Sequence, residues 1–213
     1  MYKEPKYKTI FEATEEELQS LKNKSFNDPW KPVYHIYPEY GLLNDPNGLA
    51  YYNGRYHVFH QWYPFGVIHG MKHWAHLEST DLANWSRQPV ALVPVEAYES
   101  HGSYSGTSIQ IGEELYLYYT GNIKYDKEER SATQCLAIMN KNGEISKYKR
   151  NPIIGDIPEG YTGHVRDPKV FKKNDIYYMI LGAQRINEIG AFIVYKSHDG
   201  LEWSFLGELE MLN

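Results

Sequence analysis

Two aspartates and one serine stand at matching places along this sequence. Asp45 and Asp167 each precede a proline and an apolar or aromatic run, and Ser105 lies 60 residues after Asp45 and 62 before Asp167. Two carboxyl groups in one site, one ionised and one protonated and about 5–5.5 Å apart, suit the cleavage of a glycosidic bond with retained configuration. A nearby negative charge stabilises the oxocarbenium-like transition state of that reaction. Taken alone, residues 44–48 (NDPNG) are equally typical of a surface turn with a solvated carboxylate.

The residues around these positions predict short strands separated by tight turns. Asn53-Gly54 predicts a two-residue hairpin, because both residues tolerate a positive φ. In this first stretch, aromatic and apolar residues predict strands at roughly 48–53, 55–63, 72–79 and 89–93. The stretches that begin near Ser105 and Asp167 show the same order of strand, polar turn and aromatic strand.

A second landmark supports a repeated unit. Ser-Thr-Asp with Trp85 and Ser-His-Asp with Trp203 are 118 residues apart, which is close to two periods of about 60. Four strands in each unit predict an all-β fold built of β-propeller blades. The alternative is chance similarity among Tyr-rich strands. In a propeller the first strand of each blade lines the central channel, so we expect Asp45, Ser105 and Asp167 to meet at one channel mouth.

The composition excludes several classes of function. The chain has 213 residues with 22 Lys and Arg against 27 Asp and Glu, and its net charge of −5 and lack of a basic stripe argue against a nucleic-acid partner. No apolar run approaches the roughly 18 residues of a membrane span, and the charged N-terminus does not read as a secretory signal. Aromatic residues make up 15% of the chain, which suits β-sheet and also sugar binding.

Cys135 is the single cysteine of the sequence. It can form no intrachain disulfide, and this favours a reducing, cytoplasmic location. Its neighbours (ATQCLAIMN) are typical of an ordinary strand, so we expect a core residue rather than a nucleophile.

The N-terminal region predicts a short helix outside the main fold. Thr14 and Glu17 match a capping box, and Leu18 and Leu21 follow at helical spacing, which predicts a helix near 14–23. We therefore divide the chain into a helix and lead-in at 1–32 and a partial propeller at 33–213.

Histidines gather around the first predicted unit, at His57, His60, His69, His73 and His76. Their spacings suit a metal ion on a helix, whereas this region is predicted as strand and loop with no acidic or cysteine partner. We therefore expect no metal site and no cofactor. His69 and Trp74 are expected to line a pocket beside the channel. Lys72 and His73 could meet a phosphate or be solvated loop cations.

Four motifs in a fixed order resemble glycoside hydrolase family 32, the group of invertases and fructan hydrolases. They are LLNDPNG (42–48), FHQWYP (59–64), YSGTS (104–108) and RDPKV (166–170). A further segment, KHWAHLESTDLANW, resembles the sucrose-6-phosphate hydrolase branch of bacteria. The resemblance covers residues 33–212. It implies a five-bladed β-propeller with a trailing β-sandwich, of which this chain would carry about three blades.

The resemblance implies retaining hydrolysis of the terminal β-D-fructofuranoside bond of sucrose, sucrose 6-phosphate or a fructo-oligosaccharide. Asp45 matches the nucleophile that forms a covalent fructosyl-enzyme, and Asp167 matches the residue that stabilises the transition state. Arg166 is expected to favour the ionised form of Asp167. The family often has a tryptophan in place of His69. Substrate-binding positions of the family match Asn44, Asn47, Gln61, Tyr104, Ser105 and Arg166.

The general acid/base of the family is a glutamate in a Trp-Glu-Cys-Pro segment, and no glutamate here has that context. Glu202, Glu208 and Glu210 are the late candidates. We therefore expect the N-terminal part of a longer enzyme, cut before the acid and nearly inactive alone. The alternatives are a non-catalytic sugar-binding propeller, a fructosyltransferase or an arabinan hydrolase. The phosphate preference and the oligomeric state stay open.

Overall fold

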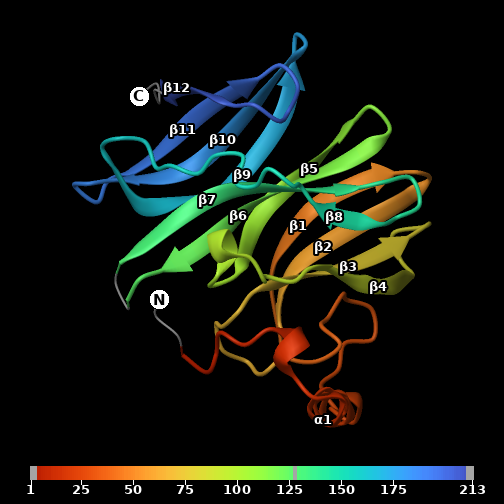
Figure 1. Cartoon of the computed structure of the whole chain (residues 1–213). Helices are drawn as coiled ribbons and strands as arrows, with labels where there is room; N and C mark the ends of the chain where they lie inside the picture. Colours follow the sequence, from red (N-terminus) through yellow and green to blue (C-terminus); the bar gives the residue numbers. More distant parts are fainter. Residues whose placement is uncertain (1–3, 127–128, 210–213) are drawn as a thin grey trace.

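Three four-stranded antiparallel sheets make up most of the computed structural model, which describes residues 4–126 and 129–209 (Figure 1). The first sheet contains β1 (Leu42–Tyr52), β2 (Arg55–Tyr63), β3 (His73–Ser79) and β4 (Trp85–Leu92). The second contains β5 (Ser103–Ile111), β6 (Glu114–Lys124), β7 (Arg130–Met139) and β8 (Ile145–Lys147). The third contains β9 (Tyr161–Lys173), β10 (Ile176–Arg185), β11 (Gly190–Ser197) and β12 (Ser204–Glu208). Strands neighbouring in a sheet are neighbours in the chain, so the predicted all-β units of four strands are confirmed.

Two apolar cores hold the sheets together face to face. Between the first two sheets, Phe59 and Trp74 pack with Leu117 and Tyr119. Between the second and third sheets, another core is built around aromatic and branched residues, among them Tyr118, Met179, Leu181 and Ile193. Burying apolar surface from both partners is the main term that stabilises such a stack of sheets.

Cys135 is fully buried in the first core, as its strand pattern predicted. Burial raises the pKa of its thiol to about 12, so the thiolate is scarce at neutral pH. The residue therefore serves packing.

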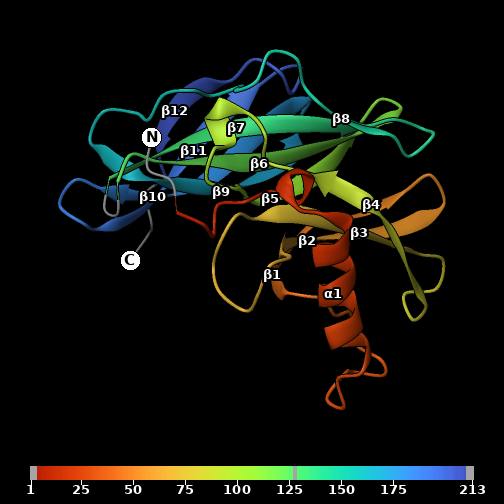
Figure 2. The ribbon, with the colours of Figure 1, turned by 60° about the horizontal axis from the view of Figure 1, so that its bottom comes forward.

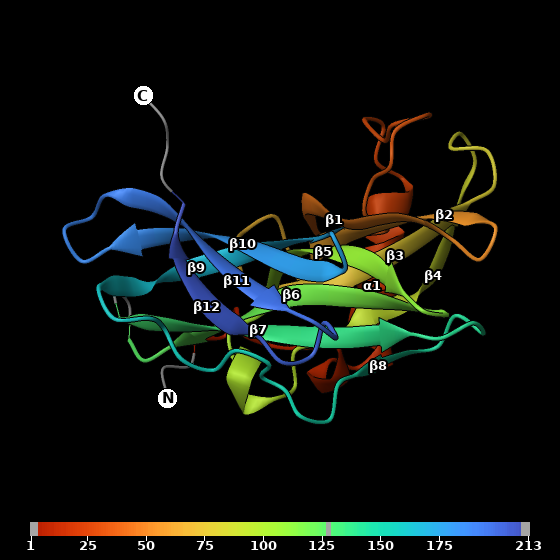
Figure 3. The same ribbon diagram turned by 90° about the horizontal axis from the view of Figure 1, so that it is seen from above.

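The first strand of each sheet is an edge strand of that sheet. β1 contacts β5, and β5 in turn contacts β9, so the three strands are side by side (Figures 1 and 3). Asp45, Ser105 and Asp167 are each carried by one of these strands. The arrangement therefore brings the three repeated positions together, as the repeat predicted.

The three positions lie within strands, at breaks in the strand register. NDPNG, which by itself suggested a turn, is part of β1 and has register shifts on both sides of Pro46-Asn47. A shift in the β5–β6 pairing spans Tyr104 and Ser105, and a shift in the β9–β10 pairing spans Asp167 and Pro168. Bulges of this kind bend a strand and redirect its side chains, and they are frequent next to active sites.

The Ser-x-Asp landmark forms the same turn in both copies. Ser79 donates to Asp81 with an O···O distance of 3.0 Å, and Ser197 donates to Asp199 at 2.9 Å. In each turn the following tryptophan donates its indole N–H to a backbone carbonyl, at 3.2 Å for Trp85 and 3.1 Å for Trp203. The shared geometry supports a true structural repeat.

The N-terminal helix α1 (Glu15–Phe26) projects away from the sheets (Figure 2). Thr14 caps it by accepting from the Glu17 N–H at 3.1 Å, and none of its residues is buried, as expected for an external helix. The segment before it is integrated into the fold, because Tyr7 is buried beside Met71 and the Met71 N–H donates to the Lys6 carbonyl at 2.9 Å. Within the described residues, no helix combines the length and apolar character required to cross a bilayer.

Gly106 lies where β5 approaches β6 too closely for any side chain. A Cβ atom there would be 1.9 Å from the Tyr118 carbonyl oxygen. We expect Gly106→Ala to lower the free energy of unfolding by about 2–4 kcal/mol, because the backbone of a central strand must move. Urea denaturation measures the change. Gly190→Ala is the control, since nothing lies within 4 Å of its added carbon; equal losses in both variants would contradict the steric explanation.

Candidate active site

Asp45 is held by a chain of hydrogen bonds that joins the first two sheets. The Ser105 hydroxyl donates to Oδ2 of Asp45 at 2.6 Å, and Gln61 donates its amide N–H to the Ser105 oxygen at 2.8 Å. Ser105 and Gln61 are buried, whereas Asp45 is exposed. The contact therefore fixes one carboxylate oxygen and leaves Oδ1 free to meet a ligand from the solvent side.

Asp167 is positioned by its backbone. Its N–H donates to the Thr120 hydroxyl at 3.0 Å, which ties β9 to β6. Its φ of 62° lies in the left-handed region, where aspartate is tolerated better than most residues but still at some cost. Residues held in such conformations cluster at functional sites, so the strain supports a role for Asp167 beyond packing.

The environment of Asp167 disfavours its charge. Partial burial raises the pKa of this carboxyl, Arg166 lowers it, and the charge of Asp45 raises it again, with a net rise. Nε of Arg166 is 3.6 Å from the Asp167 carboxylate. The expected effect of Arg166 is thus present but outweighed, since removal of solvent and a like charge act against it.

The two aspartates share one site. They come from different sheets, yet the charge of Asp45 is close enough to influence the Asp167 carboxyl, and Ser105 of the strand between them contacts Asp45. Like charges brought together repel, and this repulsion is relieved when positive charge develops between them. The pair is therefore suited to stabilise a cationic transition state.

A buried lysine lies beneath the same surface. Nζ of Lys72 donates to the Asn44 side-chain carbonyl, and the residue is only 3% exposed. Burial lowers the pKa of Lys72 to about 8, while Asp45 acts to raise it. Lys72 is therefore no solvated loop cation. Its neighbour His73 accepts from the Ile10 N–H at 3.2 Å and contacts the Met71 carbonyl at 2.9 Å, so both ring nitrogens are used within the fold.

Trp74 does not line the site, so the prediction that it lines a pocket beside the channel is wrong. It is fully buried in the first core and donates its indole N–H to the Tyr104 carbonyl at 3.0 Å. Its large apolar ring is more favourably placed between sheets than in a water-filled mouth. Trp74 thus supports the β5 bulge from below, while His69 lies in the exposed loop between β2 and β3.

The remaining predicted residues surround the aspartates at different depths. Asn47 is buried and accepts from the Gly106 N–H at 3.2 Å, so it joins the β1 and β5 bulges. Tyr104 is half-buried, and burial raises the pKa of its phenol, with smaller effects from groups that include Arg166 and Asp167. Arg166 contacts the His164 ring at 2.8 Å. The structure therefore gathers Asn44, Asn47, Gln61, Tyr104, Ser105 and Arg166 around Asp45 and Asp167.

A pocket of about 340 Å³ opens beside Asp167. Its walls come from β9, β10 and β11 and include His164, Arg166, Gln184 and Phe192. This volume falls in the lower range of small-ligand sites.

Two residues near Asp167, His164 and Thr120, were not predicted from the sequence. The two-residue alternation of β9 places His164 on the same side as Arg166, but the Thr120 contact depends on how two sheets meet.

The late glutamates within the described residues are engaged elsewhere. Glu202 pairs with Arg150 at 3.2 Å, and Glu208 is bound by Arg185 and by the Tyr161 hydroxyl at 2.9 Å. Glu210 lies outside the described residues. Neither Glu202 nor Glu208 therefore stands ready as an acid for the aspartate pair.

Comparison with known proteins gives a match to a family model and matches to individual relatives. The family model for the glycosyl hydrolases family 32 N-terminal domain matches residues 35–213. A probable sucrose-6-phosphate hydrolase of Psychromonas ingrahamii is 46% identical over 178 residues, which are 83% of this chain and 32% of that protein.

Solved structures agree with the sequence match. The sucrose-6-phosphate hydrolase of Lactobacillus gasseri superposes with a TM-score of 0.91 at 37% identity, over 100% of this chain and 44% of that one. A mutant of the GH32 β-fructofuranosidase of Bombyx mori in complex with sucrose superposes with a TM-score of 0.81 at 35% identity, over 92% of this chain and 41% of that one. The chain thus spans less than half the length of each of these relatives.

Proposed function

The chain belongs to glycosyl hydrolase family 32, and on this premise we propose that it carries the nucleophile half of a β-fructofuranosidase site acting on sucrose or sucrose 6-phosphate. The observation that carries the proposal is the aspartate pair, in which Asp45 is held by Ser105 and its charge helps to raise the pKa of Asp167 in another sheet. The same likeness supports a five-bladed propeller architecture, of which the three sheets would be blades.

In the proposed reaction, Oδ1 of Asp45 attacks the anomeric carbon of the fructosyl unit while the bond to the leaving oxygen breaks. The leaving oxygen takes a proton from a separate general acid. Asp167 stabilises the positive charge that develops on the ring. The conjugate base of that acid then takes a proton from water, the water oxygen attacks the same carbon, and the bond to Asp45 breaks, which gives fructose with retained configuration.

Arg166 and Lys72 supply positive charge on either side of the pair. Arg166 limits the rise in the pKa of Asp167, and Lys72 orients Asn44 from below. Arg166 suits the hydroxyl-rich substrate that we propose, because charged donors bind sugar hydroxyls strongly. A free sugar and a 6-phosphorylated sugar are both compatible with this geometry.

The chain by itself is expected to turn over sucrose at least about 10²-fold more slowly than a complete enzyme, because general acid catalysis typically contributes that much or more. The expectation rests on Glu202 and Glu208 being bound to other partners. Release of fructose from sucrose and sucrose 6-phosphate by the purified chain measures it. Turnover at the rate of a complete family member would contradict the expectation.

Product analysis of the complete enzyme tests the proposed reaction. We expect free fructose, and NMR of the first product should show retained anomeric configuration. Fructosyl oligosaccharides as main products would favour a transferase. Saturable sucrose binding without any product would favour a sugar-binding module. A cytoplasmic location stays a prediction from the cysteine usage.

A further inference from the structure

Two histidines and a glutamate converge at the far end of the first sheet from Asp45. His57 stands on β2, and His76 and Glu78 stand two residues apart on β3. His57 pairs with Glu78 across the two strands, so all three side chains lie on one face of the sheet. His57 is opposite Ala50, five residues along β1 from Asp45, or about 16 Å at 3.3 Å per residue. The cluster is therefore separate from the site above.

The three donor atoms are spaced as metal ligands are. Nδ1 of His57 is 3.0 Å from Nε2 of His76 and 3.6 Å from Oε1 of Glu78, and the His76 nitrogen is 3.9 Å from the same oxygen. Ligands that bind Zn²⁺ tetrahedrally at 2.0–2.1 Å lie about 3.4 Å from one another. The observed distances bracket this value, so an ion would require only small side-chain movements.

The hydrogen bonds around the cluster already orient the ligands. Nε2 of His57 lies 3.1 Å from the Tyr52 carbonyl, which can only accept, so the ring carries its proton there and turns the Nδ1 lone pair toward His76. Metal-binding histidines commonly make this type of bond to a backbone carbonyl. Arg55 lies 3.8 Å from the other oxygen of Glu78, and Phe59 stacks on the His76 ring with centroids 4.3 Å apart.

Both imidazole rings are shielded from solvent, since His57 and His76 are each only 4% exposed. In the metal-free protein the His76 Nε2 proton is shared with His57. On metal binding that proton moves to Nδ1 of His76, and the ring stays neutral.

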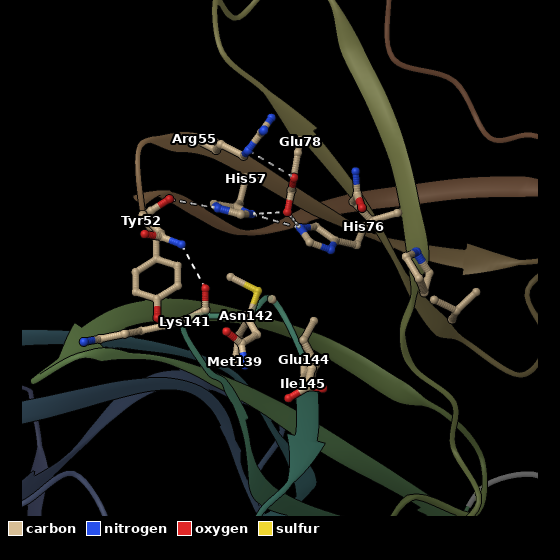
Figure 4. A pocket seen from close by; sticks show the side chains of 15 residues that line it. Tyr52, Arg55, His57, His76, Glu78, Met139, Lys141, Asn142, Glu144 and Ile145 are labelled. Atoms are coloured by element: carbon tan, nitrogen blue, oxygen red, sulfur yellow. Dashed lines mark hydrogen bonds and ion pairs between the residues drawn. The ribbon is translucent and has the colours of Figure 1, made fainter.

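The cluster also has an entrance. A pocket of about 600 Å³ adjoins it, between β2 and β3 on one side and the turn from β7 to β8 on the other (Figure 4). Figure 4 shows the two rings and the carboxylate on one wall of this pocket. The pocket gives an ion access and leaves room for water as a fourth ligand. A partly open site of two histidines and one glutamate is a known arrangement for zinc.

We propose that His57, His76 and Glu78 form a binding site for a divalent transition-metal ion, with Zn²⁺ as the best match to the two imidazoles and one carboxylate. The histidine spacing along the chain suits a metal ion only on a helix, and the sequence therefore predicted no metal site here. On paired strands, two ligands can come from positions i and i+2 of one strand, here His76 and Glu78. The third can come from the neighbouring strand, here His57.

The test is binding of Co²⁺ to the metal-free protein, followed by its visible absorption, with Zn²⁺ added as competitor. We expect one ion per chain, displacement by Zn²⁺, and a melting temperature that rises with Zn²⁺ concentration. Glu78→Gln should raise the Kd at least about 10-fold, since even indirect perturbation of metal sites costs 10–100-fold. Circular dichroism confirms that the variant is folded.

Glu144→Gln is the matched control, because Glu144 lines the same pocket but is not part of the cluster. It should leave the Kd unchanged. The absence of stoichiometric Co²⁺ or Zn²⁺ binding by the unmodified protein would overturn the proposal, whatever the variants do. Equal weakening by both substitutions would also overturn it, since binding would then depend on pocket charge alone.

Discussion

Replacing Asp45 with asparagine in the complete enzyme is expected to lower kcat by about 10⁴- to 10⁶-fold, the scale seen when an enzyme loses its nucleophile. The amide keeps the shape of the carboxylate and can still accept the hydrogen bond that Ser105 donates at 2.6 Å. It cannot attack the anomeric carbon. Initial rates of fructose release measure the loss, with little change in the free energy of unfolding.

Asp175→Asn provides the control for this substitution. Asp175 lies in the turn between β9 and β10 with its side chain 95% exposed, and its φ of 62° is one that asparagine also tolerates. This variant should retain full activity. A loss of less than about tenfold in Asp45→Asn would contradict the nucleophile assignment and favour a sugar-binding role.

Replacing Asp167 with asparagine is expected to lower kcat by roughly 10²–10³-fold, the typical cost of removing one group that stabilises a transition-state charge. The nucleophile and its Ser105 contact remain in place, so the loss should be smaller than that at Asp45. Rates measured at saturating sucrose or sucrose 6-phosphate provide the test. Unchanged kcat would exclude Asp167 from transition-state stabilisation.

Asp167→Asn should lower kcat but raise the free energy of unfolding. The folded state raises the pKa of Asp167, so it favours the protonated acid over the carboxylate. The contribution of this group to stability is therefore greatest below the unfolded pKa and is lost as the pH rises through the folded pKa. Asparagine mimics the neutral acid at every pH.

We therefore expect Asp167→Asn to gain stability relative to the unmodified protein between pH 4 and 7, as measured by urea midpoints. The half-exposed side chain makes the gain small, because solvent screens its charge. A variant that loses stability progressively over this range would show that Arg166 dominates the environment of Asp167. Loss of activity without loss of stability would mark Asp167 as a residue kept for function at a structural cost.

The strand breaks explain how regular sheets present these groups. In an unbroken strand, neighbouring side chains point to opposite faces. The regular strand pairing is interrupted at each candidate position. The register shifts lie at residues 43–46 of β1, 103–106 of β5 and 166–169 of β9. Ser105 can then reach Asp45, and Asp167 can adopt its positive φ. The site is thus made of three similar irregularities on three adjacent strands.

The sequence alone predicted the repeat and the strands of each unit, and it singled out the aspartate pair as a candidate site. Strand alternation and the Asn53-Gly54 turn are local patterns, and they folded as their residue types predicted. The two Ser-x-Asp landmarks were predicted only as a repeat, and both form the same turn. The family motifs also follow from residue order along the chain. Such features depend on neighbours within a few positions, which a sequence displays directly.

Only the tertiary structure decided how those groups act on one another. It buried Trp74 in the core and tied Thr120 to the backbone of Asp167. It also raised the pKa of Asp167, because loss of solvent and the charge of Asp45 together outweigh the attraction of Arg166. It also placed the carboxylate of Glu78 close to His57 and His76, a grouping that the spacing along the sequence does not show. These outcomes depend on strand register and on which sheet faces which, and both are set by packing between residues far apart in the chain.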